Sequence, residues 1–378
     1  MNFDKLTAYL DSLKSVGIPG CDVAIWQAHR PIYRHLAGHR DVACLQPMLG
    51  DETYWLYSLT KVLTASCIMR LREAGKIDLE DPVARYLPAY AEMCVRRGES
   101  AVSSHTPLTI RHLLTMQGGL DYVLDAPEIE ACLRQTRGKA TTREIVDALA
   151  ARPLHFEPGS HFLYSLCHDV LGGVIEAVSG QTFGEYMREN IFDPLEMFSM
   201  SFRRTPELAE RMAARFIYNM ADLTSRPDSM GNVHNKYVLS SAYESGGAGL
   251  IGDVEDYMRF ADALANDGIG WNGYRLLSSN SIDEMRTDQL EGASRVDFLQ
   301  FNRLGYSYAL GVRTLVDGRM SRSPVGEFGW DSAAGGWVLV DVERRLSAFY
   351  AQHVLECGYS HEVIHPTVRD LIYEGLDS

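Results

Sequence analysis

The spacing of apolar residues at the start of the chain predicts a helix followed by a hairpin. Leu6, Leu10 and Leu13 share one face of a helix over about residues 1–16. After Gly20, alternating apolar residues predict two strands with a turn between them. We therefore expect an N-terminal helix that packs on an antiparallel hairpin.

A mostly buried helix is predicted to begin at Ser58. Apolar residues recur at helical spacing from there to Arg72, and Gly75 supplies a left-handed stop just beyond. Helical periodicity, broken by turns, continues to about residue 290. After Leu304 the pattern becomes strand-like and the chain ends in a helix. The predicted segments are strands over residues 306–312, 335–340 and 346–351 and a helix over about residues 361–374.

Strands at both ends of the chain and helices between them predict a discontinuous α/β (α+β) fold. Residues 1–57 and 300–378 are expected to form an α/β sandwich around one antiparallel sheet. Residues 58–299 are expected to form a mostly helical domain, with the active site in the cleft between the two. A chain of 378 residues is long enough for each part to bury its own core.

Composition narrows the classes of partner. The net charge of −14 and the scattered arginines disfavour binding to nucleic acid. No stretch approaches the roughly 18 apolar residues that span a bilayer, so we expect no membrane partner. The N-terminus shows no apolar signal core, and the seven cysteines never form a Cys-x-x-Cys pair, which predicts reduced thiols in a cytoplasmic protein. The sequence is compatible with a homo-oligomer.

Candidate chemistry begins with Ser58-Leu59-Thr60-Lys61, the only Ser-x-x-Lys in the chain. On a helix, this step places the lysine ammonium beside the serine hydroxyl, and the helix N-terminus favours developing negative charge. A lysine held in a dry cleft has a lowered pKa and can accept a proton. A purely structural interpretation would make Ser58 a helix N-cap and Lys61 a solvent-exposed side chain. The apolar neighbours Trp55, Leu56 and Val62 disfavour it. No serine lies in a Gly-x-Ser-x-Gly elbow.

Two later segments fit the same chemistry. Tyr164 lies between a Pro-Gly turn and a helical run, where its phenol could come within hydrogen-bond reach of Ser58. One tyrosine among 19 is weak evidence by itself. Residues 326–335 are rich in small residues and enter a strand, so a backbone N–H there could face a substrate carbonyl. A plain hairpin turn explains that segment equally well.

Together these segments resemble the superfamily of serine β-lactamases, penicillin-binding proteins and family VIII carboxylesterases, and most closely its esterase and class C-like branch. The similar segments follow in order along nearly the whole chain. They are residues 57–61, 108–119, 156–176, 191–195, 246–250 and 327–335. The resemblance implies a β-lactamase/transpeptidase-like fold, with an antiparallel sheet flanked by helices and an α-rich domain.

The resemblance also implies a role for each part of the site. Ser58 would be acylated, and Lys61 and Tyr164 would take its proton and later activate water. The backbone N–H groups of Ser58 and Ala333 would hold the oxyanion. No cofactor and no metal is implied.

Two departures from the β-lactamase pattern concern substrate binding. Leu166 stands where the pattern has an asparagine, and Trp330-Asp331-Ser332 stands where it has a lysine or histidine, a small residue and glycine. Trp330 resembles the esterase branch, so ester hydrolysis ranks above β-lactam hydrolysis. Asp331 could favour a cationic or hydroxylated substrate, and Ser332 could crowd the oxyanion edge.

The predicted function is therefore a serine hydrolase that cleaves a small-molecule ester or amide, with carboxylic esters favoured. A β-lactamase, a D-aminopeptidase or amidase, and an acyltransferase with the same site remain alternatives, as does an inactive binding or sensor protein. His361 and His365 are four residues apart on the predicted last helix but lack a recognisable third ligand. We therefore expect no metal site there, and we expect His112, His161 and His168 to be hydrogen-bonded structural histidines.

Overall fold

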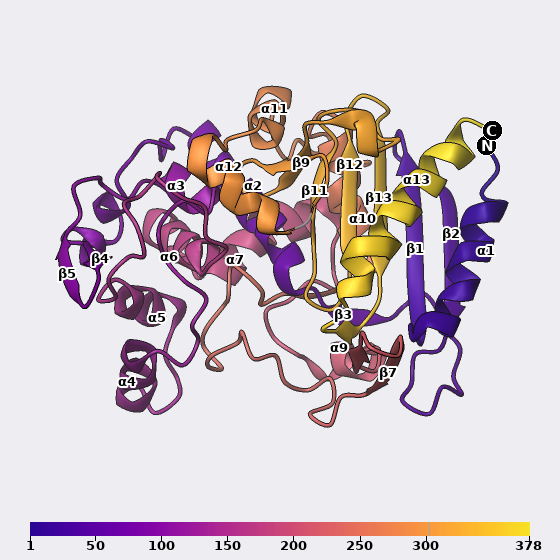
Figure 1. Cartoon of the computed structure of the whole chain (residues 1–378), viewed down its shortest axis with the longest axis horizontal. Coiled ribbons are helices and arrows are strands. Elements are labelled where there is room, and N and C mark those ends of the chain that lie inside the picture. The colour runs from indigo at the N-terminus through magenta and orange to yellow at the C-terminus, as the bar shows by residue number, and fades with distance from the viewer. Residues whose placement is uncertain (302) are drawn as a thin grey trace.

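A seven-stranded antiparallel sheet assembled from both ends of the chain dominates one half of the molecule (Figure 1). The computed structural model describes residues 1–301 and 303–378. The strands are ordered β2-β1-β13-β12-β11-β10-β9. Their bounds are β1 Gly20–Gln27, β2 Arg30–Gly38, β9 Tyr306–Tyr308, β10 Arg313–Leu315, β11 Phe328–Asp331, β12 Trp337–Asp341 and β13 Leu346–Ala351. The predicted antiparallel sheet, with strands from both termini, is confirmed.

Helices cover both faces of this sheet because its strands are apolar on both sides. In β1, Val23 and Ile25 pack into one cluster with α1 and α13, whereas Ala24 and Trp26 join the larger core on the other face. Helix α10 packs on that second face, against β1, β12 and β13. These three helices are α1 Asp4–Ser12, α10 Val254–Ala265 and α13 His365–Leu376. The chain termini lie together at the edge of this half (Figure 1).

The other half is mostly helical, as the periodicity predicts. Its helices are α2 Thr60–Glu73, α3 Ile110–Leu114, α4 Pro127–Gln135, α5 Thr142–Leu149, α6 Cys167–Ser179, α7 Phe183–Met187, α8 Asp193–Leu195, α9 Pro206–Arg211, α11 Ser279–Arg286 and α12 Gly292–Phe298. Short strands form three further sheets: β3 Thr53–Trp55 with β8 Ile251–Asp253, β4 Cys94–Arg97 with β5 Ser100–Ser103, and β6 Phe216–Asn219 between β7 Thr224–Pro227 and β14 Val354–Leu355. Helix α2 is buried along most of its length and packs against α6.

Two predicted elements differ from the structure. The strand expected over residues 306–312 ends at Tyr308, because Gly311 takes a left-handed φ of 79° and turns the chain into β10. A Cβ at Gly311 would lie 2.7 Å from the Ala65 side chain, so this close approach requires glycine. The final helix begins with a π-helical turn over Ser360–Ile364 before α13.

The predicted division into two domains stays a prediction, but the packing of α10 bears on it. This helix lies within the segment 58–299, yet it packs on the sheet. A helix from the middle of the chain therefore covers part of one face of the sheet. No helix within residues 1–301 and 303–378 is both long and apolar enough to cross a membrane.

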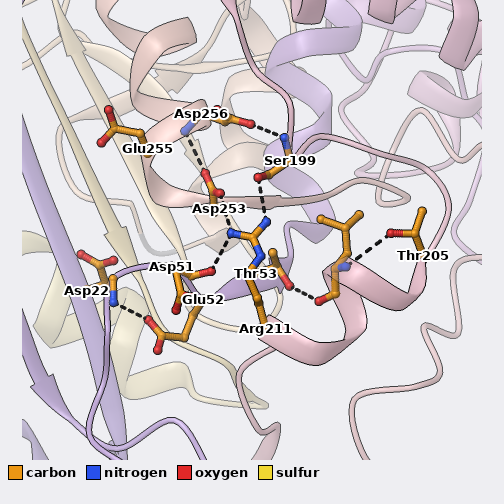
Figure 2. A network of polar contacts seen from close by, with 12 residues as sticks. Asp22, Asp51, Glu52, Thr53, Ser199, Thr205, Arg211, Asp253, Glu255 and Asp256 are labelled. Carbon is orange, nitrogen blue, oxygen red and sulfur yellow. Dashed lines mark hydrogen bonds and ion pairs between the residues drawn. The ribbon is translucent and has the colours of Figure 1, made fainter.

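A network of polar side chains ties α9 to the loop before β3 and to the start of α10 (Figure 2). Arg211 donates to the Asp51 carbonyl (3.0 Å), to Ser199 Oγ (2.8 Å) and to Asp253 Oδ2 (3.4 Å). Asp253 caps α10 by accepting from the Asp256 N–H at 2.9 Å. Asp256 in turn accepts from the Ser199 N–H at 2.5 Å. The network thus fixes the helix that supports the sheet.

Replacing Asp256 with asparagine is expected to stabilise the protein at alkaline pH. Burial, reinforced by the charge of Asp253, raises the pKa of Asp256 to about 7. A carboxyl whose pKa is raised by folding contributes stability at low pH and loses it as the pH rises from about 4 to about 7. Asp256→Asn should therefore raise the free energy of unfolding by about 1 kcal/mol or more at pH 8 and by much less at pH 5. Urea unfolding at both pH values measures this.

Glu255→Gln is the matched control, because Glu255 is a neighbouring acid on the same helix whose side chain is 45% exposed. Its effect on unfolding should not depend on pH in this way. Equal effects of Asp256→Asn at pH 5 and pH 8 would contradict the prediction.

Candidate active site

Ser58 lies in a single 3-10 turn, Tyr57–Leu59, that leads directly into α2. The preceding residue, Tyr57, has a left-handed φ of 47°, a strained conformation for a bulky side chain. Its buried phenol accepts a hydrogen bond from Arg215 Nη1 at 2.9 Å, and Arg215 is ion-paired with Asp228 at 2.7 Å. These contacts hold the strained backbone that places Ser58 immediately before the N-terminus of α2.

Lys61 is completely buried one turn beyond the serine. Its Nζ lies 3.3 Å from Ser58 Oγ, 2.7 Å from the Gly247 carbonyl oxygen and 3.4 Å from Tyr122 Oη. It also lies 4.6 Å from the centroid of the Tyr164 ring. The Gly247 carbonyl and the Tyr122 hydroxyl can accept two N–H groups of a neutral amine, which leaves its lone pair for the serine proton.

The surroundings set different protonation states for the two candidate bases. Burial lowers the pKa of Lys61 to about 7, and the carboxylate of Asp169 partly opposes this shift. Burial raises the pKa of Tyr164, and the hydrogen bonds to Ser58 and Trp330 offset only part of that effect. Near neutral pH, Lys61 can therefore accept a proton, whereas Tyr164 keeps its own and can donate it.

These side chains line a cavity of about 230 Å³. Much of its wall is aromatic, and the rest is polar. Its lining residues are Ser58, Tyr122, Tyr164, Tyr237, Phe301, Arg303, Trp330, Asp331, Ser332, Ala333 and His361. A larger hollow of about 700 Å³ shares Tyr164 and Phe301 with it. The structure thus brings Ser58, Tyr164 and Ala333 to one cavity although they are far apart in sequence, and Lys61 lies directly behind it.

The end of β11 supplies the opposite wall. Trp330 Nε1 donates to Tyr164 Oη at 3.1 Å, and the two rings stack with centroids 5.6 Å apart. Beyond the strand, the Ser332 hydroxyl accepts from the Ala334 N–H at 3.2 Å, so it stabilises its own turn. Trp330 therefore orients the phenol, and Ala333 lines the cavity beside it.

Two residues predicted to bind substrate have other surroundings in the structure. Asp331 is buried between Arg303 (2.5 Å) and Arg313 (3.2 Å). Burial raises its pKa, but Arg303, His361 and Arg313 outweigh burial and hold the pKa well below its usual value. Two guanidinium groups therefore already balance the charge of Asp331, which disfavours selection of a cationic substrate. Asp331 still lines the cavity, and its role toward a hydroxylated substrate stays a prediction. Leu166 is only 2% exposed and is not among the lining residues.

Sequence reasoning missed Tyr122 and Asp169. Tyr122 stacks on Tyr164 with centroids 5.7 Å apart and reaches Lys61. It lies three residues beyond Gly119, the end of the segment 108–119 singled out in the sequence, and this closeness was the available signal. Nothing in the local pattern around Asp169 indicated that it lies behind Lys61.

Two of the three histidines expected to be structural have side-chain hydrogen-bond partners. His112 accepts from the Thr109 N–H at 3.2 Å in a helix cap, and His161 lies 2.9 Å from Asp297. His168 is fully buried. Neither ring nitrogen of His168 has a hydrogen-bond partner among the described residues. The structural role expected of these histidines stays a prediction.

His361 and His365 do have a third potential ligand, because donor atoms of Asp331 and both histidines lie within 4.8 Å of one another. Sequence spacing could not reveal this group, since Asp331 comes from β11. However, Arg303 and Arg313 both contact the Asp331 carboxylate, and His365 Nε2 lies 2.9 Å from the Gly335 carbonyl oxygen. Two guanidinium groups beside the carboxylate oppose a divalent cation.

A serine beside a buried lysine, in a cavity at the edge of an antiparallel sheet, defines an enzyme of the serine hydrolase and acyltransferase type. The profile of the Beta-lactamase family matches residues 4–355. The chain therefore belongs to that family. The predicted fold and the resemblance to β-lactamases, penicillin-binding proteins and esterases are confirmed.

Relatives with assigned names include both esterases and acyltransferases. Esterase EstB of Burkholderia gladioli is 32% identical over 287 residues, which cover 71% of this chain and 69% of the relative. Monacolin J acid methylbutanoyltransferase of Aspergillus terreus is 28% identical over 301 residues, covering 75% and 70%. The structure of EstCE1, a hydrolase with promiscuous acyltransferase activity, superposes with a TM-score of 0.80 at 24% identity and covers 98% of each chain, which supports the fold.

Proposed function

We propose that this protein hydrolyses small carboxylic esters through an acyl-enzyme intermediate on Ser58. The observation that carries the proposal is the buried Lys61 Nζ, 3.3 Å from Ser58 Oγ at the cavity. A lysine whose pKa burial lowers to about 7 can take the serine proton at neutral pH. A solvent-exposed pair would have no such consequence, because an exposed lysine stays protonated at neutral pH.

The reaction would proceed in two steps. Lys61 takes the proton of Ser58 as Oγ attacks the ester carbonyl, and the Ser58 and Ala333 N–H groups stabilise the oxyanion. The C–O bond of the ester breaks, and the leaving alcohol takes a proton from Tyr164, which the Lys61 ammonium replenishes. Water then attacks the acyl-serine and gives a proton to the Lys61 amine. The bond between the acyl group and Ser58 Oγ breaks, a proton passes from Lys61 through Tyr164 to Ser58 Oγ, and the carboxylic acid is released.

Two departures from the β-lactamase pattern support esters over lactams. Trp330 occupies the position of the family's cation, and its ring packs on Tyr164. Leu166, in place of the family's asparagine, is buried. The groups that grip a β-lactam carboxylate and amide are therefore replaced by apolar side chains. The similarity to esterase EstB points the same way.

Transfer of the acyl group to an alcohol is the second candidate. The hollow of about 700 Å³ adjoins the reaction cavity at Tyr164 and Phe301, where an acyl acceptor could bind in place of water. Similarity to the monacolin J acid methylbutanoyltransferase favours the same activity. Hydrolysis and transfer share the acyl-enzyme, so only the acceptor distinguishes them.

A substrate comparison tests the proposal. We expect kcat/KM for p-nitrophenyl butyrate to exceed that for nitrocefin and for D-alanine p-nitroanilide by at least about 10²-fold. Added alcohols, with product esters measured, report acyl transfer. Faster turnover of nitrocefin or the anilide would overturn the ester assignment. A folded protein whose Ser58 is not labelled by a fluorophosphonate would instead be a binding or sensor protein.

A further inference from the structure

Asp169 is a buried carboxylate that no step above uses. It lies in the first turn of α6 and is completely inaccessible to solvent. Its Oδ1 accepts hydrogen bonds from Tyr243 Oη (2.6 Å), Ser245 Oγ (2.6 Å) and the Gly247 N–H (3.4 Å). Asp169 therefore holds the segment 243–247, whose Gly247 carbonyl accepts from Lys61 Nζ at 2.7 Å.

The second oxygen, Oδ2, is buried without a hydrogen-bond partner among the described residues. A Cβ built on Gly247 would lie 2.6 Å from this Oδ2, 3.1 Å from Tyr122 Oη and 3.4 Å from Lys61 Nζ. The three polar atoms thus face the same side of Gly247. A carboxylate near an amine in a buried site interacts with its charge more strongly than it would in water.

The other titratable groups around this pair are neutral near pH 7. They are Tyr90, Tyr122, Tyr164, Cys167, His168 and Tyr243. Burial raises the pKa of the phenols and of the thiol, and it lowers the pKa of the imidazole. Asp169 is therefore the counter-charge available to Lys61 within this set.

We propose that Asp169 is the positioning residue of the base: it fixes the carbonyl that orients Lys61 and supplies the negative charge that stabilises the ammonium formed when Ser58 loses its proton. In this step the proton moves from Ser58 Oγ to Lys61 Nζ. Burial raises the pKa of the Asp169 carboxyl, and the hydrogen bonds from Ser245 and Tyr243 and the charge of Lys61 oppose that shift and favour the carboxylate. The inference rests on the proposed function, since it assigns a partner to the same base. It explains why a buried lysine still binds a proton near neutral pH.

The test is the pH dependence of Ser58 labelling by a fluorophosphonate, whose rate reports the ionisation of the free enzyme. In Asp169→Asn, loss of the negative charge lowers the pKa of Lys61. The acidic limb of the labelling rate should then move to lower pH by about 1 unit, and the plateau rate should fall about tenfold. An unshifted limb would overturn the inference.

Asp262→Asn is the control for the loss of a buried aspartate. Asp262 lies on α10 and contacts His29 and Asn266, so its replacement should lower stability without moving the limb. If Asp169→Asn does not fold, the double variant Tyr243→Phe, Ser245→Ala removes two donors to the carboxylate and favours its neutral form. It should shift the limb in the same direction, and an unshifted limb there overturns the inference too.

The two proposals fail in different ways. Unlabelled wild-type protein would overturn the proposed function, and with it the role of Asp169. Labelled wild type with an identical limb in the Asp169 variant would overturn the role of Asp169 alone.

Discussion

Ser58→Ala is expected to lower kcat/KM for p-nitrophenyl butyrate by at least about 10³-fold while the protein stays folded. The variant removes the oxygen that forms the acyl-enzyme, and only stabilisation of water attack by the rest of the site would remain. Ser58 Oγ makes its hydrogen bond to Lys61 Nζ at the cavity surface, so alanine leaves no large void. Steady-state kinetics and a thermal melt measure both parts of the prediction.

Ser66→Ala provides the comparison on the same helix. Ser66 is completely buried, and its hydroxyl donates to the Val62 carbonyl at 2.9 Å, away from the cavity lining. Its replacement should change kcat/KM by no more than about threefold, although it costs some stability. Ester turnover by Ser58→Ala above about a tenth of the wild-type rate would rule out Ser58 as the nucleophile.

Lys61→Met is expected to lower kcat/KM by about 10²–10⁴-fold, the usual contribution of a general base. In the wild type, kcat/KM should rise with pH through about 7, because the Lys61 amine must lose its proton before it can accept that of Ser58. Methionine has a similar size but no basic group. The limb near pH 7 should therefore disappear in the pH profile of the variant.

The same substitution should stabilise the fold. Folding lowers the pKa of Lys61 to about 7, so the unfolded chain binds more protons and stability rises with pH between about 7 and 10. Lys61→Met removes this penalty and should raise the free energy of unfolding by more than about 1 kcal/mol at pH 6. Urea unfolding at pH 6 and pH 10 measures the difference.

Lys76→Met is the control, because Lys76 lies just beyond the same helix and is exposed. It should change neither the pH limb nor the stability at pH 6. A limb near pH 7 that persists in Lys61→Met would assign the ionisation to another group.

Local geometry explains what could be predicted from the sequence. The three-residue step from Ser58 to Lys61 on a helix necessarily brings the two side chains together, whatever surrounds them. The alternating pattern of β1 and the C-terminal segments likewise predicts strands at both ends of the chain. Both signals depend on residues close together in the chain.

Other parts of the fold could not be predicted from local helix and strand patterns. The strand expected over residues 306–312 breaks at Gly311 because that backbone packs against Ala65 on α2, more than 200 residues earlier. Helix α10 lies on the sheet although periodicity alone assigned it to the helical half. Each depends on a contact between distant segments, to which helical or strand periodicity is blind.

By itself, the sequence determined which groups are available for the proposed chemistry: a serine, a lysine on the same helix face and a later tyrosine. Only the tertiary structure decided the charge environment of those groups. It placed Asp169 against the Gly247 segment that contacts Lys61, and it paired Asp331 with two arginines that balance its charge. The reason is physical, since a side chain's protonation and charge depend on burial and on neighbours that the folded chain brings from distant positions.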